Sequence, residues 1–181
     1  MNKIVKNALI LMAITLVSGL LLGLVYQVTK DPIAAEEAKE KQEAYQAVFP
    51  DAASFEELDE KDASLEKAAD VLEENSLSAE HIDEVLGAVD DSGKLLGVVM
   101  NVTTTEGYGG DINFSMGIQK DGTLNGIQIL SISETAGLGM RAKEASFQDQ
   151  FAGKNVKKFT YTKTGASADD EIDALSGATV T

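Results

Sequence analysis

Residues 112–119 read Ile-Asn-Phe-Ser-Met-Gly-Ile-Gln and alternate apolar with polar or small side chains along their whole length. Because successive side chains of a strand point to opposite faces, this period of two predicts a strand with one buried face. Asp121-Gly122 follows directly and is typical of a tight turn, and residues 127–132 continue as a second apolar run. Strands joined by turns this short pair antiparallel, so this part of the chain predicts the centre of an antiparallel sheet.

The same pattern extends in both directions from this centre. Residues 85–89 and 95–102 are apolar runs on either side of Asp-Asp-Ser-Gly at 90–93, which predicts a hairpin. On the C-terminal side, residues 142–151 predict a short helix and residues 156–161 one more strand. Helices before and between antiparallel strands make the expected fold class α+β.

The N-terminal segment is apolar and uncharged. Residues 8–29 hold no charged side chain, and a helix of about twenty such residues crosses the hydrocarbon core of a membrane. The run is longer than the apolar part of a signal peptide, so we expect a retained transmembrane helix. Lys3 and Lys6 precede it. By the positive-inside rule, residues 1–7 are expected in the cytoplasm and the chain after Lys30 on the extracytoplasmic side.

Residues 30–80 predict an acidic, helical connecting region between the span and the sheet. A helix is expected to begin at Asp31 and Pro32 and to form a stalk that ends near Pro50. Further helical or loosely ordered chain should follow, and its apolar side chains should pack on the remaining domain, residues 81–181. Those side chains are Leu58, Leu65, Ala69 and Leu72.

Charge and composition exclude several kinds of partner and site. The chain has 30 acidic and 15 basic residues, a net charge of −15, with most of the acids between Asp31 and Asp91. Such a surface repels phosphate backbones, so no nucleic-acid partner is expected. The chain has no cysteine and one histidine, His81. Iron–sulfur ligation and thiolate or histidine-rich metal sites are therefore excluded, and no metal is expected.

Three short segments outside the expected strands could bind a ligand. They are Gly-Tyr-Gly-Gly at 107–110, Glu-Thr-Ala-Gly-Leu-Gly at 134–139, and Asp-Ala-Leu-Ser-Gly-Ala-Thr at 173–179. Glycine allows a ligand or a second backbone to approach closely, and Leu138 between two glycines could present an apolar surface to a flat ring. Small residues around the final threonine leave room for a bulky group on its hydroxyl. Taken alone, the first and third segments favour an ordinary turn or helix cap, and the second is ambiguous.

Together and in this order, the three segments and the N-terminal span resemble the FMN-binding domain shared by the RnfG and NqrC subunits of bacterial ion-pumping redox complexes. The resemblance covers the whole chain in layout and is specific to motifs from about residue 95 onward. In that family the threonine that closes the Ser-Gly-Ala-Thr run bears FMN through a phosphoester bond, which implies Thr179 here rather than Thr181. The resemblance also implies a separate flavin transferase that recognises Asp173.

The same resemblance implies which residues surround the flavin. They are Tyr108, Glu134, Thr135, Gly137, Leu138, Ser176, Gly177 and Ala178. This sequence departs from the family at Ala136, where proline is usual, and at Ile132-Ser133, where a histidine often precedes the loop. Family members also continue into a helix after the last motif, so we expect a C-terminal tail to be missing from this sequence.

The length of the chain favours RnfG, since NqrC is usually longer. The resemblance therefore implies an electron-relaying subunit of an ion-translocating ferredoxin:NAD oxidoreductase, coupled to Na⁺ or H⁺ transport and lacking catalytic residues of its own. Its partners would be the other subunits of the Rnf complex, in the bacterial inner membrane. Two alternatives remain open: an NqrC-like subunit of a Na⁺-pumping NADH:quinone reductase, and a membrane-tethered assembly module that binds no cofactor.

Overall fold

The computed structural model describes residues 2–59 and 61–178, and the chain divides into two units, Met1–Glu40 and Lys41–Thr181. The first unit is helical and belongs to α1 (Lys3–Val48). Among the described residues, α1 is the one helix long and apolar enough to cross a membrane. This agrees with the span expected from the sequence.

The prediction of a separate stalk helix is wrong, because α1 continues through Asp31 and Pro32 and ends at Val48. A proline inside a helix donates no hydrogen bond and its ring crowds the carbonyl one turn earlier. A long helix tolerates one such defect when the residues on both sides favour helix, as the alanine-, glutamate- and lysine-rich sequence after Pro32 does. The expected end of the helix near Pro50 is confirmed.

The second unit is built on a five-stranded antiparallel sheet in the order β1-β2-β3-β4-β5. Its strands are β1 (Ser54–Glu57), β2 (Glu80–Val89), β3 (Leu95–Thr104), β4 (Ile112–Gln119) and β5 (Leu124–Ile132). The four strands from β2 onward confirm the expected α+β fold with its antiparallel sheet. The expectation failed at β1, where no strand was foreseen. That strand is short and mostly exposed, and it forms because its backbone pairs with β2, which its side chains do not signal.

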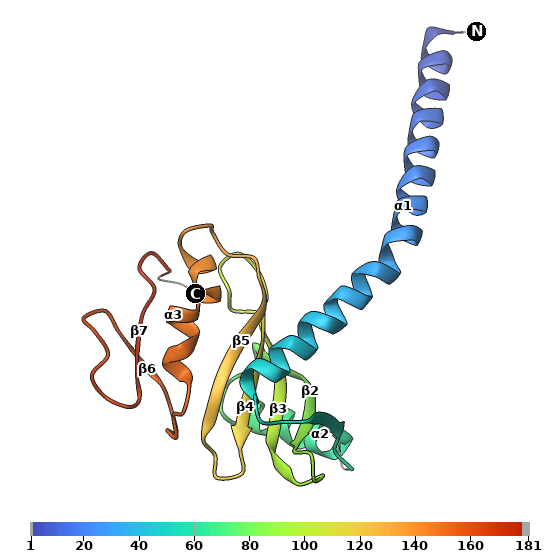
Figure 1. Ribbon diagram of the computed structural model, residues 1–181. Helices are drawn as coiled ribbons and strands as arrows, with labels where there is room; N and C mark the ends of the chain where they lie inside the picture. The colour runs from blue at the N-terminus through green and yellow to red at the C-terminus, as the bar shows by residue number, and fades with distance from the viewer. Residues whose placement is uncertain (1, 60, 179–181) are drawn as a thin grey trace. The chain divides into compact units, whose positions relative to one another are not determined.

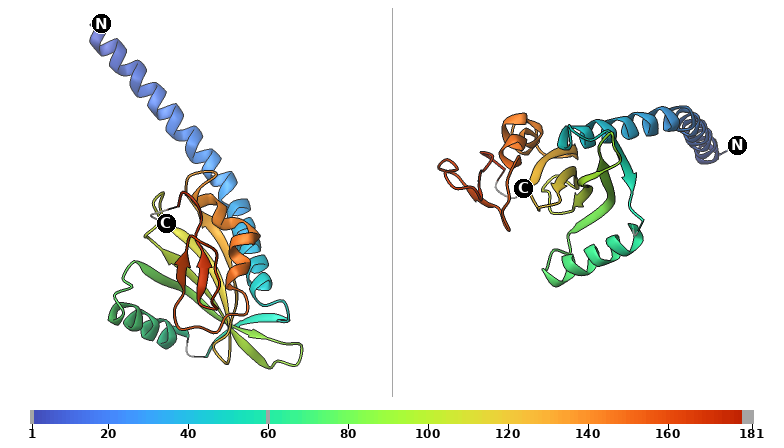
Figure 2. Two further views of the ribbon diagram at one scale, coloured as in Figure 1. Left: turned by 90° about the vertical axis from the view of Figure 1, so that its left-hand side faces the viewer. Right: turned by 60° about the horizontal axis from the view of Figure 1, so that its bottom comes forward.

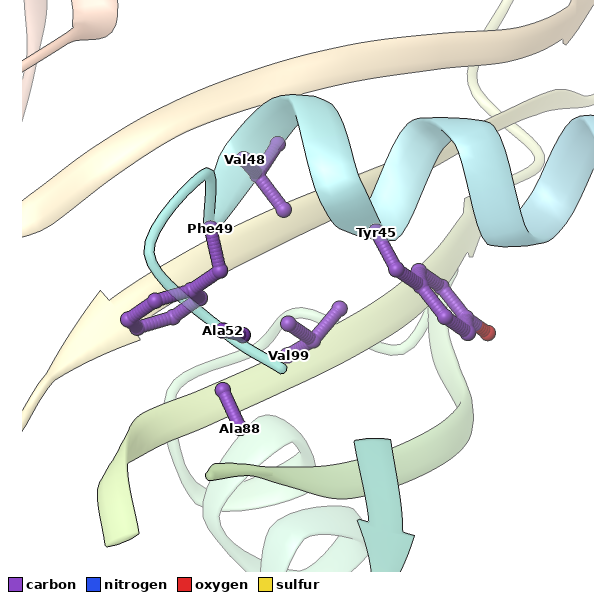
Figure 3. Close-up of a cluster of buried hydrophobic side chains, with 6 residues drawn as sticks. All are labelled: Tyr45, Val48, Phe49, Ala52, Ala88 and Val99. Carbon is purple, nitrogen blue, oxygen red and sulfur yellow. The ribbon is translucent and has the colours of Figure 1, made fainter. Parts of the chain in front are cut away.

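One face of the sheet is covered by the C-terminal end of α1 within this unit. Tyr45, Val48 and Phe49 point toward the sheet and pack with Ala52, Ala88 and Val99 in a fully buried cluster (Figure 3). The backbone of the helix end comes so close that a Cβ on Gly117 of β4 would lie 2.7 Å from the Val48 carbonyl oxygen. This close approach fixes the end of α1 on the sheet.

The opposite face is covered on the β2 side by α2 (Lys61–Glu74), away from α3 (Figure 2). Leu65, Ala68 and Leu72 are its half-buried apolar residues, whereas Ala69 is exposed. The prediction for Ala69 was therefore wrong, because the buried stripe runs through the neighbouring position 68. Leu58 was also expected on this helix, but it precedes α2, and its Cδ2 would lie 3.1 Å from a Cβ on Gly87.

On the β5 side the same face is covered by three short helical turns in place of the single helix expected over residues 142–151. They are η1 (Gly139–Lys143), α3 (Ala145–Gln148) and η2 (Asp149–Phe151). Ile129, Ile132 and Ala142 form a second buried cluster there, joined by the half-buried side chains of Phe147 and Leu175. Leu175 therefore fixes the C-terminal segment to the sheet.

The C-terminal region adds a two-stranded parallel sheet, β6 (Thr160–Thr162) with β7 (Glu171–Asp173). A strand was expected over residues 156–161, whereas β6 covers residues 160–162, so the predicted bounds were wrong. Its neighbour β7 was not foreseen, because three residues are too few to show a period. The α3 turn lies between β5 and this pair (Figure 1), and the rings of Phe151 and Phe159 meet edge to face with centroids 5.2 Å apart.

Tyr45 provides a test of how the end of α1 is held. Its hydroxyl donates a hydrogen bond of 2.6 Å to Glu84 Oε2, and burial, with this bond and the nearby carboxylates of Glu84 and Asp83, raises the pKa of Tyr45. The folded state thus favours the neutral phenol, and this contribution to stability is present below about pH 10 and lost above it, where the unfolded chain ionises first.

We expect Tyr45→Phe to lower the free energy of unfolding by about 1 kcal/mol at pH 8, through loss of the hydrogen bond. The wild type should lose more stability than the variant between pH 9 and 11, as measured by urea unfolding of the detergent-solubilised protein. Equal losses in the two proteins over that range would contradict the assigned role of Tyr45.

Candidate functional site

The first two glycine-containing loops lie against each other at one end of the sheet, after β3 and after β5. The backbone N–H of Gly109 donates a hydrogen bond of 3.1 Å to Glu134 Oε1. A Cβ on Gly109 would lie 2.1 Å from the carbonyl oxygen of Ser133, and one on Gly107 would lie 2.2 Å from that of Gly110. Glycine is required at both positions, because the two backbones leave no space for a side chain.

Glu134 is the residue that joins these loops. It is half-buried, and besides its bond to Gly109 its side chain passes directly beneath Gly139, where a Cβ would lie 2.7 Å from Glu134 Cβ. The loop between them is closed by the N–H groups of Leu138 and Met140, which both donate to the carbonyl of Thr135 at 3.1 and 3.3 Å. Gly137 has φ +78° at the tip of this loop.

The third segment reaches the second loop through Gly177. The N–H of Ala178 donates to the carbonyl of Leu175 at 3.3 Å, which closes a turn with Gly177 at its third position. The φ of +84° at Gly177 is the value that such a turn requires and that glycine adopts freely. A Cβ there would lie 2.4 Å from Leu138 Cδ2, so the Leu138 side chain occupies the space beside Gly177.

The structure therefore brings together Glu134, Leu138, Gly177 and the 107–110 loop, which are far apart in the sequence. Thr179, expected to bear the flavin, lies outside the described residues, directly after this turn. Tyr108 is joined to the group through its own loop but its side chain is exposed.

Two glutamines that the sequence did not single out hold this site in place. Gln148 is buried, accepts a hydrogen bond of 2.7 Å from the N–H of Ile129 in β5 and donates one of 2.9 Å to the carbonyl of Lys143. Gln150 accepts a bond of 2.6 Å from the N–H of Asp173 and donates one of 3.4 Å to its carbonyl. Nothing in their sequence pattern distinguishes them from solvated glutamines, because their role depends on pairing with distant backbone.

Asp173, expected to be recognised by a flavin transferase, is the exposed last residue of β7. Its Oδ1 accepts a hydrogen bond of 2.7 Å from the N–H of Ala166. The neighbouring Glu171 accepts bonds from the N–H groups of Ser167 and Ala168 and from the Ser167 hydroxyl, and these bonds lower the pKa of Glu171. The two acids thus shape the loop that precedes β7.

The groups around the turn match the chemistry of FMN, a flat ring with apolar faces, polar edges and a phosphate. Leu138 and Met140 are 40% and 36% exposed and offer apolar surface. In the described part of the chain, the amides of Ser176 and Gly177 make no hydrogen bond, and neither do the hydroxyls of Thr135 and Ser176. Free amides and hydroxyls in a turn suit phosphate oxygens or a polar ring edge. The residues present therefore fit this cofactor.

Glu134 gives a local test of the loop geometry. We expect Glu134→Ala to speed hydrogen exchange at the Gly109 amide by about tenfold, because the charged acceptor of that amide is lost. Glu134→Gln keeps an oxygen at the same place and should leave exchange close to wild type. Mass-spectrometric exchange on both variants is the measurement, and equal protection of Gly109 in wild type and Glu134→Ala would contradict the contact.

Comparison with known proteins places these features in a family. Residues 107–181 match the model of the FMN-binding domain, and residues 1–48 match that of the RnfG N-terminal region. The G subunit of the Na⁺-translocating ferredoxin:NAD⁺ oxidoreductase complex of Acetobacterium woodii is 33% identical over 97% of this chain and 83% of its own length. The G subunit of the ion-translocating oxidoreductase complex of Methanosarcina acetivorans is 30% identical over 99% of this chain and 87% of its own length.

Solved structures with a similar arrangement include NqrC of Shewanella oneidensis. It is 25% identical to this chain, with a TM-score of 0.47, and the similar region covers 54% of this chain and 48% of that protein.

Proposed function

The chain belongs to the RnfG family of ion-translocating oxidoreductase subunits, and from that premise we propose that it relays electrons through FMN bound covalently to Thr179. The observation that supports this most is that the 107–110 loop and the turn that precedes Thr179 both contact the segment 133–139. The FMN-binding family model begins at residue 107 and includes all three loops.

Each residue of the site has a role in this proposal. The Thr179 hydroxyl forms the phosphoester, the amides of Ser176 and Gly177 donate to phosphate oxygens, and the small Ala178 leaves room for the attached group. Thr135, Gly137 and Leu138 lie against the flavin ring. Glu134 fixes the 107–110 loop through Gly109, which places Tyr108 at the edge of the site. A flavin transferase recognises Asp173 and transfers FMN from FAD to the Thr179 hydroxyl, which breaks the phosphoanhydride bond of FAD and releases AMP.

Bound FMN accepts and releases one or two electrons, so it can connect carriers of different kinds. The residues of this chain keep the cofactor in one place and determine its surroundings. The A. woodii relative is named as part of a ferredoxin:NAD⁺ oxidoreductase, and we assign this chain to a complex with the same reaction, coupled to Na⁺ or H⁺ movement. The name of that relative favours this reaction over the quinone-reducing alternative.

We further propose a single span with the sheet domain on the extracytoplasmic side of the cell membrane. Lys3 and Lys6 flank the N-terminal end of the apolar part of α1, and basic residues stay preferentially in the cytoplasm. On that side of the membrane a covalent bond prevents loss of the cofactor by diffusion.

The relay function is tested in the assembled complex. Complexes with wild-type chain and with Thr179→Ala are purified after co-expression with the flavin transferase, and their ferredoxin-dependent reduction of NAD⁺ is compared. We expect the variant complex to assemble with all its subunits and to lose this activity. Turnover at the wild-type rate in a complex that contains the variant would overturn the relay.

A further inference from the structure

One exposed segment of this acidic protein is basic. Residues 150–168 contain four lysines and no acid, whereas the whole chain has twice as many acids as bases, 30 against 15. Lys157 and Lys158 precede β6 and Lys163 follows it, and all three are exposed. We call these three residues the lysine patch.

The lysine patch has no ion-pair partner among the described residues. Two acids of the neighbouring strand β7 use their carboxylates on backbone amides instead: Glu171 accepts from those of Ser167 and Ala168, and Asp173 accepts from that of Ala166. In a chain so rich in carboxylates, three exposed lysines of one short segment that have no ion-pair partner among the described residues are available for acids of another molecule.

The backbone that bears the lysine patch is held firmly. The Phe159 ring packs on Phe151, and the N–H of Thr160 donates to the carbonyl of Asp170 at 2.8 Å. Before the patch, Asn155 donates from its side-chain amide to the carbonyl of Asp121 at 3.2 Å and to the hydroxyl of Thr123 at 3.1 Å. A surface ordered in advance loses less conformational entropy when it binds a partner.

An exposed aromatic residue lies within the lysine patch. Tyr161 of β6 is 77% exposed. Among the described residues β6 pairs with β7 alone, so its second edge is open. Tyrosine amid charged residues is typical of protein interfaces, where the ring gives contact area and the charges give orientation. An open strand edge also offers backbone N–H and C=O groups that can pair with a strand of another protein, whereas a lipid surface has no strand to pair with.

The lysine patch adjoins the candidate flavin site. The N–H of Ala174 donates to the carbonyl of Thr162 at 2.8 Å, so the end of β6 lies beside the segment that leads to Ser176 and the turn. A partner bound at Tyr161 would therefore lie on the strand pair that leads to the candidate flavin site. Electron-transfer encounters commonly use small interfaces with complementary charge.

We propose that the lysine patch, with Tyr161 at its centre, docks an acidic protein surface of another subunit of the same complex. The inference rests on membership of the complex and on the charges and contacts above, and it does not require the covalent flavin. The proposal gives a function to a basic segment that has no role in the flavin site.

The test is zero-length crosslinking of the purified complex with a carbodiimide, which joins a lysine amine to a carboxylate in direct contact. We expect mass spectrometry to find Lys157, Lys158 or Lys163 joined to an Asp or Glu of another subunit. If other lysines of this chain form crosslinks between subunits and these three form none, the proposal is overturned. Flavin content does not enter this readout, so its outcome is separate from that of the proposed function.

A charge-reversal series gives a second readout. The variant Lys157→Glu/Lys158→Glu/Lys163→Glu should slow electron transfer through the complex by on the order of tenfold at low salt, with much less effect at high salt. The control Lys67→Glu/Lys94→Glu/Lys120→Glu makes the same change in net charge at exposed positions elsewhere. Equal effects of the two triple variants would contradict a specific docking surface.

The alternative occupant, anionic lipid, is separated by reconstitution into nanodiscs of phosphatidylcholine with and without phosphatidylglycerol. The effect of the charge-reversal variant should be the same in both. An effect confined to discs with phosphatidylglycerol would overturn docking to protein in favour of a lipid contact.

Discussion

A Thr179→Ala variant, co-expressed with the flavin transferase, is expected to show no flavin fluorescence on a denaturing gel, whereas the wild type fluoresces strongly. Denaturation removes every cofactor held by non-covalent contacts, and the variant lacks the hydroxyl that would form the phosphoester. The fold should be unaffected, since the residues that pack the preceding turn are Leu175 and Gly177. The measurement is in-gel fluorescence under ultraviolet light, normalised to stained protein.

The matched control is Thr181→Ala, which removes a hydroxyl two positions further along the same segment. This variant should fluoresce as the wild type does. Thr179→Ser, which keeps a hydroxyl, should retain at least part of the signal. Persistent fluorescence in Thr179→Ala, or its loss in Thr181→Ala, would place the bond elsewhere.

Gly97→Ala is expected to lower the free energy of unfolding by about 3 kcal/mol. A Cβ at Gly97 would lie 2.2 Å from the carbonyl oxygen of Ile118 and 2.8 Å from Phe49 Cζ. The oxygen belongs to the backbone of β4, the neighbouring strand, and the ring belongs to the buried cluster under α1. The methyl group would therefore displace either the strand pairing or the end of α1.

The measurement is chemical denaturation of the detergent-solubilised protein followed by circular dichroism. Ser131→Thr is the control, because it adds one carbon on an exposed position of β5 and should change the stability by less than about 0.5 kcal/mol. Gly97→Ala with a stability within that margin of wild type would show that the sheet and helix end do not approach as closely as described.

The sheet was predictable from the sequence where residues repeat a local pattern. Residues 112–119 alternate strictly, and the turns at 90–93 and 121–122 use residues that tight turns favour, so β2 to β5 were found. The short strands β1 and β7 were not, and β6 was predicted with the wrong bounds, because three or four residues carry no readable period. Their formation depends on backbone pairing with segments elsewhere in the chain, which no local pattern records.

The candidate site was predictable only in part, for the same reason. The glycines at 107–110, 137 and 177 could be recognised as positions of close approach or positive φ. The hydrogen bond between Glu134 and Gly109 could not be predicted, and neither could the position of Leu138 beside Gly177, because both depend on tertiary contacts. Glutamines 148 and 150 were missed because a buried glutamine and a solvated one look alike in sequence.

The flavin bond is tested most directly by the mass of one peptide from the wild-type protein. Cleavage by trypsin after Lys163 releases a peptide that begins at Thr164 and contains Thr179. In protein purified from cells with the flavin transferase, this peptide should be heavier by the mass of FMN less water, and fragmentation should place the increase on Thr179. An unmodified peptide from such cells, or the increase on another residue, would contradict covalent attachment at Thr179.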